Sequence, residues 1–114
     1  MAITTDEVRH WALQQPHAVE MIHRKSPSFR VNMRIFCMMP VGADWVTLKL
    51  DREDQLNMME GHPDVVTPAR LYSHHGWTYL WLAPADEQLA RTLLHLAWTH
   101  VAPKAMVKAS RLAM

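Results

Sequence analysis

The sequence predicts one α+β domain over residues 1–114, a two-layer sandwich in which helices pack on one face of an antiparallel sheet. Segments with helical spacing of apolar residues and segments with strand-like alternation follow each other in the order α-β-β-β-α-β-β-α. The chain has 114 residues, of which 49% are hydrophobic, and this composition suits a single core.

The first helix is expected over about residues 5–14. Thr4 is a good N-cap, and Glu7, three residues later, can reach back to complete a capping box. The helix should end before Pro16, because the residue that precedes a proline is disfavoured in the helical conformation. The buried stripe of this helix would consist of Val8, Trp11 and Ala12.

Three strands are expected next, over 28–31, 34–39 and 45–50. A tight turn at Asn32-Met33 would join the first two, although methionine is a poor residue for the positive φ of such a turn. The third strand alternates cleanly. Its aliphatic face is Val46, Leu48 and Leu50, and its other face is Trp45, Thr47 and Lys49.

A second helix should begin after Asp51, a good N-cap, and end at Gly61. Leu56 and Met59 would face the core. Residues 65–67 form a short extended piece, and a strand over 77–82 follows. One face of that strand would carry Thr78, Leu80 and Leu82, and the other Trp77, Tyr79 and Trp81.

The last helix should begin at Pro84, because proline is tolerated in a first turn, and end before Pro103. Its apolar stripe would contain Leu89, Leu93, Leu96, Ala97 and His100, widened by Leu94 and Trp98. The tail over 103–114 is basic, and its residue pattern is compatible with a further helix.

The net charge of +1 is unevenly distributed. Residues 44–64 carry six acids and two bases, a net charge of −4, whereas four bases and no acid follow Glu87. Basic ends permit an anionic partner. The sequence pI of about 8.0 is nevertheless below the value above about 9 that is typical of dedicated nucleic-acid-binding domains.

The single cysteine, Cys37, excludes an internal disulfide and favours a reducing compartment. The N-terminal residues contain no apolar signal core, and no apolar run approaches the roughly 18 residues of a membrane span. We therefore expect a cytoplasmic protein without a membrane partner, either a monomer or a homodimer.

The histidines, cysteine and glycines do not predict catalysis or a metal site. His74 and His75 are adjacent and would point to opposite sides of a strand, and His95 and His100 lie on different helix faces. Cys37 lies in mid-strand, where a thiol is normally inert packing. The three glycines are separate and form no phosphate-binding loop. We therefore expect a non-enzymatic binding protein with no cofactor and no metal.

The aromatic face of the sheet is the most informative candidate site. Arginine and lysine neutralise phosphates, and aromatic rings stack bases at about 1–3 kcal/mol per base. If the protein binds DNA, we expect the contacts to come from the hairpin over 28–39, Lys49 and the basic tail. The candidate nucleic-acid- or ligand-binding residues are Arg30, Arg34, Lys49, Trp45, Trp77, Tyr79, Trp81, His75 and Lys104.

The same face has other interpretations, and the sequence leaves them open. Aromatic rings with a few polar groups also describe a pocket for a planar small molecule. An exposed sheet would equally suit a protein partner in a chaperone-like module. Alternatively, the rings pack beneath the loop over 62–76 or the tail, or form a dimer interface.

Four blocks of this sequence resemble the MmcQ/YjbR family. They are Ser26-Pro27-Ser28-Phe29-Arg30-Val31, Leu48-Lys49-Leu50-Asp51, His75-Gly76-Trp77-Thr78, and Trp98 through Val101-Ala102-Pro103-Lys104. The blocks follow the family's order and spacing and span nearly the whole chain. The chain departs from the family at the hairpin turn, where the family often has Asn-Gly-Lys. Here Asn32-Met33-Arg34 replaces it and keeps the positive charge.

The resemblance implies a CyaY-like, secretion-chaperone-like fold with the same order of elements. It also implies a DNA-binding role, proposed for the family from its likeness to a double-wing DNA-binding domain. The family offers no accepted catalytic residues to carry over, and likeness of fold is a weak warrant for function.

Overall fold

The computed structural model describes residues 2–112 and confirms the predicted α+β class. The helices are α1 (Thr5–Leu13), α2 (Arg52–Gly61), α3 (Glu87–Val101), α4 (Lys104–Leu112) and a short 3-10 helix, η1 (Ser73–His75). The strands are β1 (Val19–His23), β2 (Ser26–Val31), β3 (Arg34–Met38), β4 (Trp45–Lys49), β5 (Val66–Pro68) and β6 (Trp77–Trp81). None of the helices within residues 2–112 has both the length and the apolarity needed to cross a membrane.

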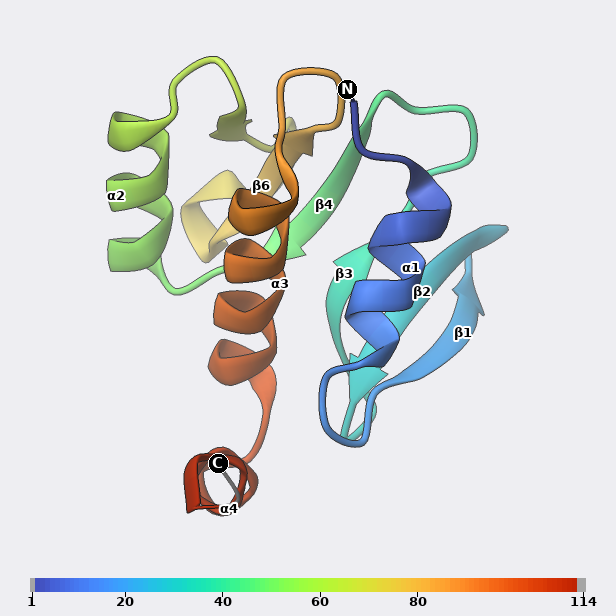
Figure 1. The fold of residues 1–114 in the computed structure, drawn as a ribbon, viewed down its shortest axis with the longest axis vertical. Coiled ribbons are helices and arrows are strands. Elements are labelled where there is room, and N and C mark those ends of the chain that lie inside the picture. The colour runs from blue at the N-terminus through green and yellow to red at the C-terminus, as the bar shows by residue number, and fades with distance from the viewer. Residues whose placement is uncertain (1, 113–114) are drawn as a thin grey trace.

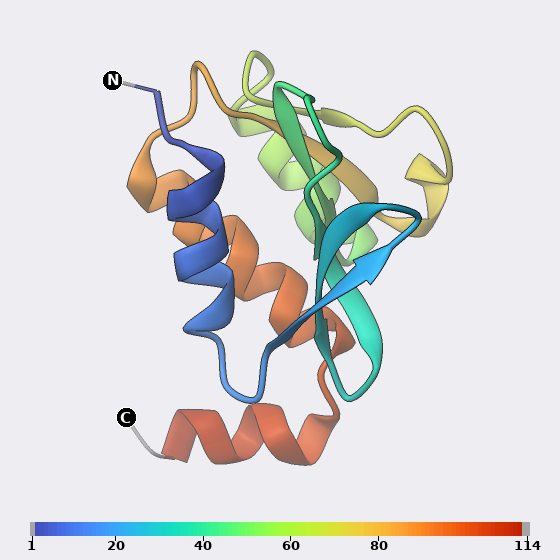
Figure 2. The same cartoon turned by 90° about the vertical axis from the view of Figure 1, so that its right-hand side faces the viewer.

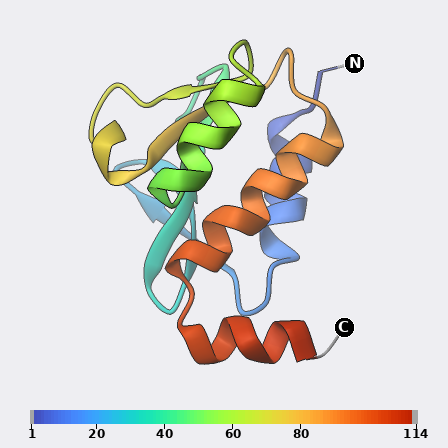
Figure 3. The same ribbon diagram turned by 90° about the vertical axis from the view of Figure 1, so that its left-hand side faces the viewer.

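The six strands form one antiparallel sheet in the order β1-β2-β3-β4-β6-β5. Helices α1 and α3 cover one face of this sheet, and Figure 2 shows the two layers edge-on. Helix α2 contacts β5 at the edge of the sheet, and α4 lies across the end of α3 (Figures 1 and 3). The face away from α1 and α3 is called the outer face below, and the covered face is called the inner face.

The inner face is the hydrophobic core, as the alternation predicted. Val46 lies opposite Leu80 across the β4–β6 pair, and both are fully buried. Helix α3 packs on β3, β4 and α1. Trp98 of α3 is also fully buried, and its indole N–H donates to the carbonyl of Pro16 at 2.9 Å. This hydrogen bond fixes α3 to the connection between α1 and β1.

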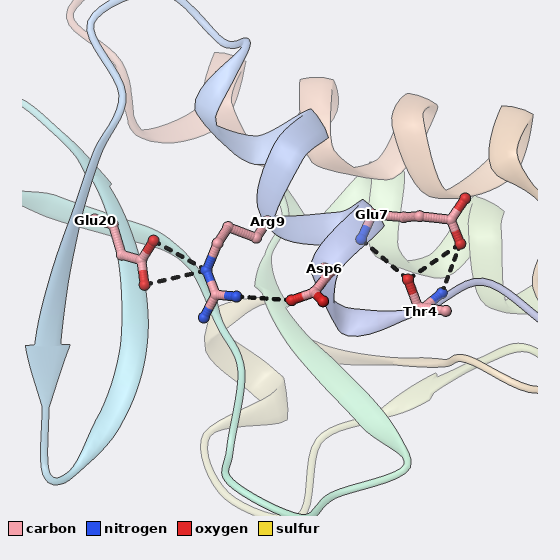
Figure 4. Close-up of polar contacts among 5 residues, drawn as sticks. All are labelled: Thr4, Asp6, Glu7, Arg9 and Glu20. Atoms are coloured by element: carbon pink, nitrogen blue, oxygen red, sulfur yellow. Dashed lines mark hydrogen bonds and ion pairs between the residues drawn. The ribbon is translucent and has the colours of Figure 1, made fainter.

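Helix α1 has the predicted capping box (Figure 4). The Glu7 amide donates to the Thr4 hydroxyl at 3.1 Å, and the Thr4 amide donates to the Glu7 carboxylate at 3.0 Å. The guanidinium of Arg9 lies between Asp6 at 3.0 Å and Glu20 of β1 at 3.1 Å. Exposed ion pairs contribute at most about 1 kcal/mol, so this one mainly orients β1 against α1.

Strand β1 was not predicted, because the turn that joins it to β2 carries none of the usual turn residues. Arg24 and Lys25 adopt φ values of 49° and 70° there, which the sequence pattern does not favour. The turn predicted at Asn32-Met33 is present, and Met33 does adopt a positive φ, of 68°. A β-bulge between β2 and β3 makes Phe36 the extra residue, so that Phe36 and its neighbour are both buried.

The helix boundaries and faces differ from the predictions in three places. Helix α3 begins after Asp86, whose carboxylate accepts the amide of Leu89 at 2.8 Å, and not at Pro84. Leu93, Leu94, Ala97 and Trp98 are buried as predicted, but His100 of the predicted stripe is exposed. The helix is apolar on several sides, so spacing alone did not set the edge of the buried stripe. In α2, Leu56 is 50% exposed and Gln55 is buried instead.

Candidate ligand-binding face of the sheet

The outer face contains a pocket of about 490 Å³. Its floor includes Ile35, Met38 and Thr47 of β3 and β4, and Trp77 and Tyr79 of β6 also line it. Two connections complete the walls, the β1–β2 turn and the segment 69–72. Both the β1–β2 turn and η1 project from the sheet on the side away from α1 and α3 (Figure 2). The volume lies within the range of about 300–1,000 Å³ that is usual for small-molecule sites.

A glycine at the start of β6 is required by close backbone contact. Gly76 adopts φ 96°, and a Cβ added there would lie 1.9 Å from the carbonyl oxygen of Leu50. The amide of Leu50 donates to the Gly76 carbonyl at 2.9 Å, which joins the end of β4 to the start of β6. This contact gives the His75-Gly76-Trp77 block a physical reason.

The buried side chain of Gln55 holds the loop that forms one wall. Its amide nitrogen donates to the carbonyls of Ser73 at 3.0 Å and Trp77 at 3.1 Å. Arg52 donates to the side-chain amide oxygen of Gln55 and, at 3.2 Å, to the backbone carbonyl of Ser73. Helix α2 thereby fixes η1, and with it the position of Tyr72, which is 62% exposed at the pocket.

The four predicted aromatic residues divide into two groups, and all four are half-buried. Trp77 and Tyr79 line the pocket, whereas Trp45 and Trp81 do not. The ring of Trp45 lies 4.9 Å from Tyr79 and 5.3 Å from Trp81, measured between centroids. The Trp81 indole N–H donates to the Thr67 hydroxyl at 2.8 Å. Part of the aromatic face is therefore packed within the chain, and part forms a concave wall.

The side chain of Lys49 contacts the main chain of His75. The Lys49 ammonium donates to the carbonyl of His75 and lies 5.3 Å from the centroid of the Trp77 ring. Burial lowers the pKa of Lys49, and the neighbouring charge of Arg34 lowers it further. The exposed ring of His75 lies 4.1 Å from that of His74. Lys49 therefore supports the wall rather than facing the pocket.

The structure does not bring the other predicted basic residues into the pocket. Arg30 is half-buried, and its Nε donates to the Ser28 hydroxyl at 3.3 Å. Arg34 is exposed at the β2–β3 turn. Lys104 begins α4, which extends toward the side of the helix layer and away from the projecting loops of the outer face (Figure 2).

Sequence reasoning missed the charged residues that do line the pocket, Arg24 and Arg70. Arg24 lies in the turn of the unpredicted strand β1, and Arg70 lies in an irregular segment. The alternation of Val19, Met21 and His23, all on the outer face, was the one signal that could have indicated β1.

Cys37 does not lie on this face of the sheet. Cys37 is fully buried on the inner face, and burial raises the pKa of its thiol strongly. Within residues 2–112, no three metal-ligating side chains lie close enough together to hold an ion.

The family model for YjbR matches residues 13–100, more than half of the chain. The chain belongs to the YjbR family. The resemblance inferred from the four sequence blocks is thus confirmed, and the match includes every residue of the pocket. Helix α4 lies outside the matched residues.

A solved structure with the same fold is that of the Deinococcus radiodurans protein DR2400, described by the family-model domain DUF419. It superposes on this YjbR chain with a TM-score of 0.76 at 24% sequence identity, over 96% of this chain and 86% of that one. At this identity the likeness shows the fold alone. No curated protein sequence matches the chain.

Proposed function

We propose that this YjbR-family protein is a binding protein that holds a planar small molecule in the outer-face pocket. The observation that carries the proposal is a cavity of about 490 Å³ with flat aromatic walls and an apolar floor. Trp77, Tyr79 and Tyr72 supply the rings, and Ile35 and Met38 supply the floor. Rings offer large rigid contact areas, and methionine adapts to irregular ligand shapes.

One wall of the pocket, formed by β6 and the segment 69–72, is held in place by contacts within the protein. Gly76 permits the close approach of β6 to the end of β4, and Gln55 ties the loop to α2. A site that is already formed loses less conformational entropy when a ligand binds. This arrangement favours a ligand-binding role for the face over a role as mere covering of the sheet.

Tryptophan fluorescence tests the proposal directly. A set of planar aromatic compounds should include at least one that quenches the emission saturably. Trp77→Leu should weaken that binding about fivefold or more, because stacking on one ring contributes about 1–3 kcal/mol. Trp45→Phe is the matched control, since Trp45 lies on the same face and outside the pocket. A diverse set without a single saturable response would sink the proposal.

DNA is the second candidate ligand, and one observation favours it. Arg24 and Arg70 line the pocket beside the exposed ring of Tyr72, so a single strand could stack a base there and place phosphates against the guanidiniums. The predicted route through Arg30, Lys49 and the tail has less support. Arg30 and Lys49 donate to partners within the chain, and α4 lies elsewhere.

A salt series distinguishes DNA from a small molecule. Affinity for an oligonucleotide should fall steeply between 50 and 200 mM salt, roughly tenfold or more for a few phosphate contacts, and Arg24→Gln should flatten the slope. Single-stranded and duplex oligonucleotides of one sequence should be compared. Affinity that does not change with salt would contradict the DNA candidate.

A further inference from the structure

We infer that the ligand of the outer-face pocket is a planar ring that carries a negatively charged group, and that Arg24 and Arg70 bind that group. The inference rests on the proposed function, because it concerns the same pocket. The inference specifies the charge of the ligand and the two arginines that recognise that charge.

The charged residues that line the pocket are all positive. Two arginines line the pocket, and no aspartate or glutamate does. Two surface arginines elsewhere have acidic partners, since Arg9 pairs with Asp6 and Glu20 and Arg91 pairs with Glu87, whereas the exposed Arg34 and Arg52 form no ion pair within residues 2–112. Within residues 2–112, neither pocket arginine forms an ion pair. An anionic ligand would supply the missing charge.

The two arginines reach the pocket from opposite edges of the sheet. Arg24 lies in the turn between β1 and β2, and Arg70 follows β5, whereas the sheet order places β1 and β5 at the two ends. The lining is therefore positive on two sides of an apolar floor. Interactions of a charge with an arginine are stronger beside such a floor than in open water, because the effective dielectric constant is lower.

The chemistry of the lining defines the ligand class. A guanidinium presents a planar fork of N–H groups that matches a carboxylate or a phosphate. Further polar groups of the lining, on His23, Ser26 and Tyr72, can contact the same anion. Both an aromatic carboxylate and a nucleoside monophosphate combine a flat ring with such a group, and the experiment separates them.

Two matched pairs of probes test the inference. They are 2-naphthoate against its neutral amide and adenosine 5′-monophosphate against adenosine, titrated by tryptophan fluorescence and calorimetry at 50 and 200 mM salt. At least one anion should bind about tenfold or more tightly than its neutral partner, and more weakly at the higher salt. The pair that shows this difference identifies the source of the anion.

Three variants locate the charge. Arg24→Gln and Arg70→Gln should each weaken binding of the anion about tenfold and leave binding of the neutral probe unchanged. Lys25→Gln is the matched control, since Lys25 is the other exposed residue of the same turn, also has positive φ and does not line the pocket. Thermal melting of each variant should coincide with that of the original protein.

Two results would overturn the inference, and they differ in what they leave standing. Equal affinity for charged and neutral probes, unaffected by Arg24→Gln and Arg70→Gln, removes the anion and keeps the planar-ligand function. Loss of anion binding in Lys25→Gln as large as in Arg24→Gln also overturns it, because the effect would then be a diffuse charge effect. If no probe of either kind binds, the proposed function fails together with the inference.

Discussion

The two faces of the β4–β6 pair differ in what covers them. On the inner face, Val46, Leu48 and Leu80 are fully buried beneath helices. On the outer face, Trp45, Tyr79 and Trp81 are only half-buried and are covered by one another and by β5. The same strands therefore carry a sealed core on one side and a surface with a pocket on the other.

This difference shows that the alternating residues of β4 and β6 form both the hydrophobic core and the surface that carries the pocket. Alternation at period two separates side chains by face, so changes on the outer face leave the core packing largely intact. Two features connect the core to the pocket. The backbone of Gly76 packs against that of Leu50, and the side chain of Gln55 donates to the loop that forms the pocket wall. The predictions below test how independent the two faces are, beginning with the largest effect.

Gly76→Ala should destabilise the protein most, by about 4 kcal/mol. The new Cβ would meet the Leu50 carbonyl oxygen at 1.9 Å, and alanine is strained at φ 96°. Gly76 contacts the backbone of the buried Leu50 and directly precedes Trp77 of the pocket, so both the core and the pocket should be disturbed. Urea denaturation measures the change, and a loss below about 1 kcal/mol would show that the backbone contact relaxes easily.

Leu80→Ala and Tyr79→Ala compare neighbours on opposite faces of β6. Leu80 is fully buried, so its truncation should cost about 3 kcal/mol. Tyr79 is half-buried, and its truncation should cost roughly half as much while weakening ligand binding. Equal losses of stability in the two variants would mean that the outer face belongs to the core after all.

Gln55→Leu should cost about 2 kcal/mol, because it removes two hydrogen bonds to the carbonyls of Ser73 and Trp77. The near-ultraviolet circular dichroism of the tryptophans should also change as the pocket wall loosens. Leu56→Gln, at the adjacent and exposed position, is the control and should be nearly neutral. A stable Gln55→Leu variant with an unchanged spectrum would argue that η1 is held by other contacts.

Thr67→Val should cost about 1 kcal/mol, because the Trp81 indole loses its acceptor. The shape of the side chain is kept, so the inner face should not respond. Thermal melting measures the shift, and Thr92→Val on the exposed side of α3 is a suitable control. A shift as large as that of Leu80→Ala would contradict the separation of the faces.

The smallest effect concerns pH. The exposed His100 is still partly desolvated by the residues around it, and this partial burial lowers the pKa of its ring. Lys49 and Arg34 lower that pKa further, whereas the acids Asp51 and Asp54 raise it. The folded state therefore favours the neutral ring. The unfolded chain binds the proton more readily below its ordinary pKa of about 6.5, so this contribution to stability is present above that pH and is lost as the pH falls.

His100→Gln should remove this part of the pH dependence. Free energies of unfolding at pH 7.5 and pH 5.0 measure it, and the original protein should lose more stability on acidification than the variant does. An identical loss in both would show that the partly exposed ring is screened by solvent.

Most of the fold could be predicted because its signals are local. The capping box at Thr4, the cap at Asp51 and the alternation of β4 and β6 all appear where the sequence places them. Strand β1 escaped because Arg24 and Lys25 adopt a turn conformation that their residue types disfavour. The start of α3 was placed too early because proline suits a first turn, and His100 was wrongly assigned to the buried stripe because Leu-rich spacing does not set the edge of that stripe.

The candidate site was predicted only in part, for a related reason. Trp77 and Tyr79 were found because they share a strand with an obvious aromatic pattern. Arg24, Arg70 and Tyr72 come from segments without a periodic pattern, and they reach the pocket only when the hairpin and the loop project over the sheet. Lys49 and Arg30 have the right charge, yet their donors are already used within the chain.

By itself, the sequence determined the α+β class, the family and the division of β4 and β6 into an aliphatic and an aromatic face. These properties follow from residue type and spacing, which act over a few residues. Only the tertiary structure decided which aromatic rings pack together, which of them form a pocket and which charges surround it. Those choices depend on contacts between segments far apart in the chain, and local spacing carries no information about them.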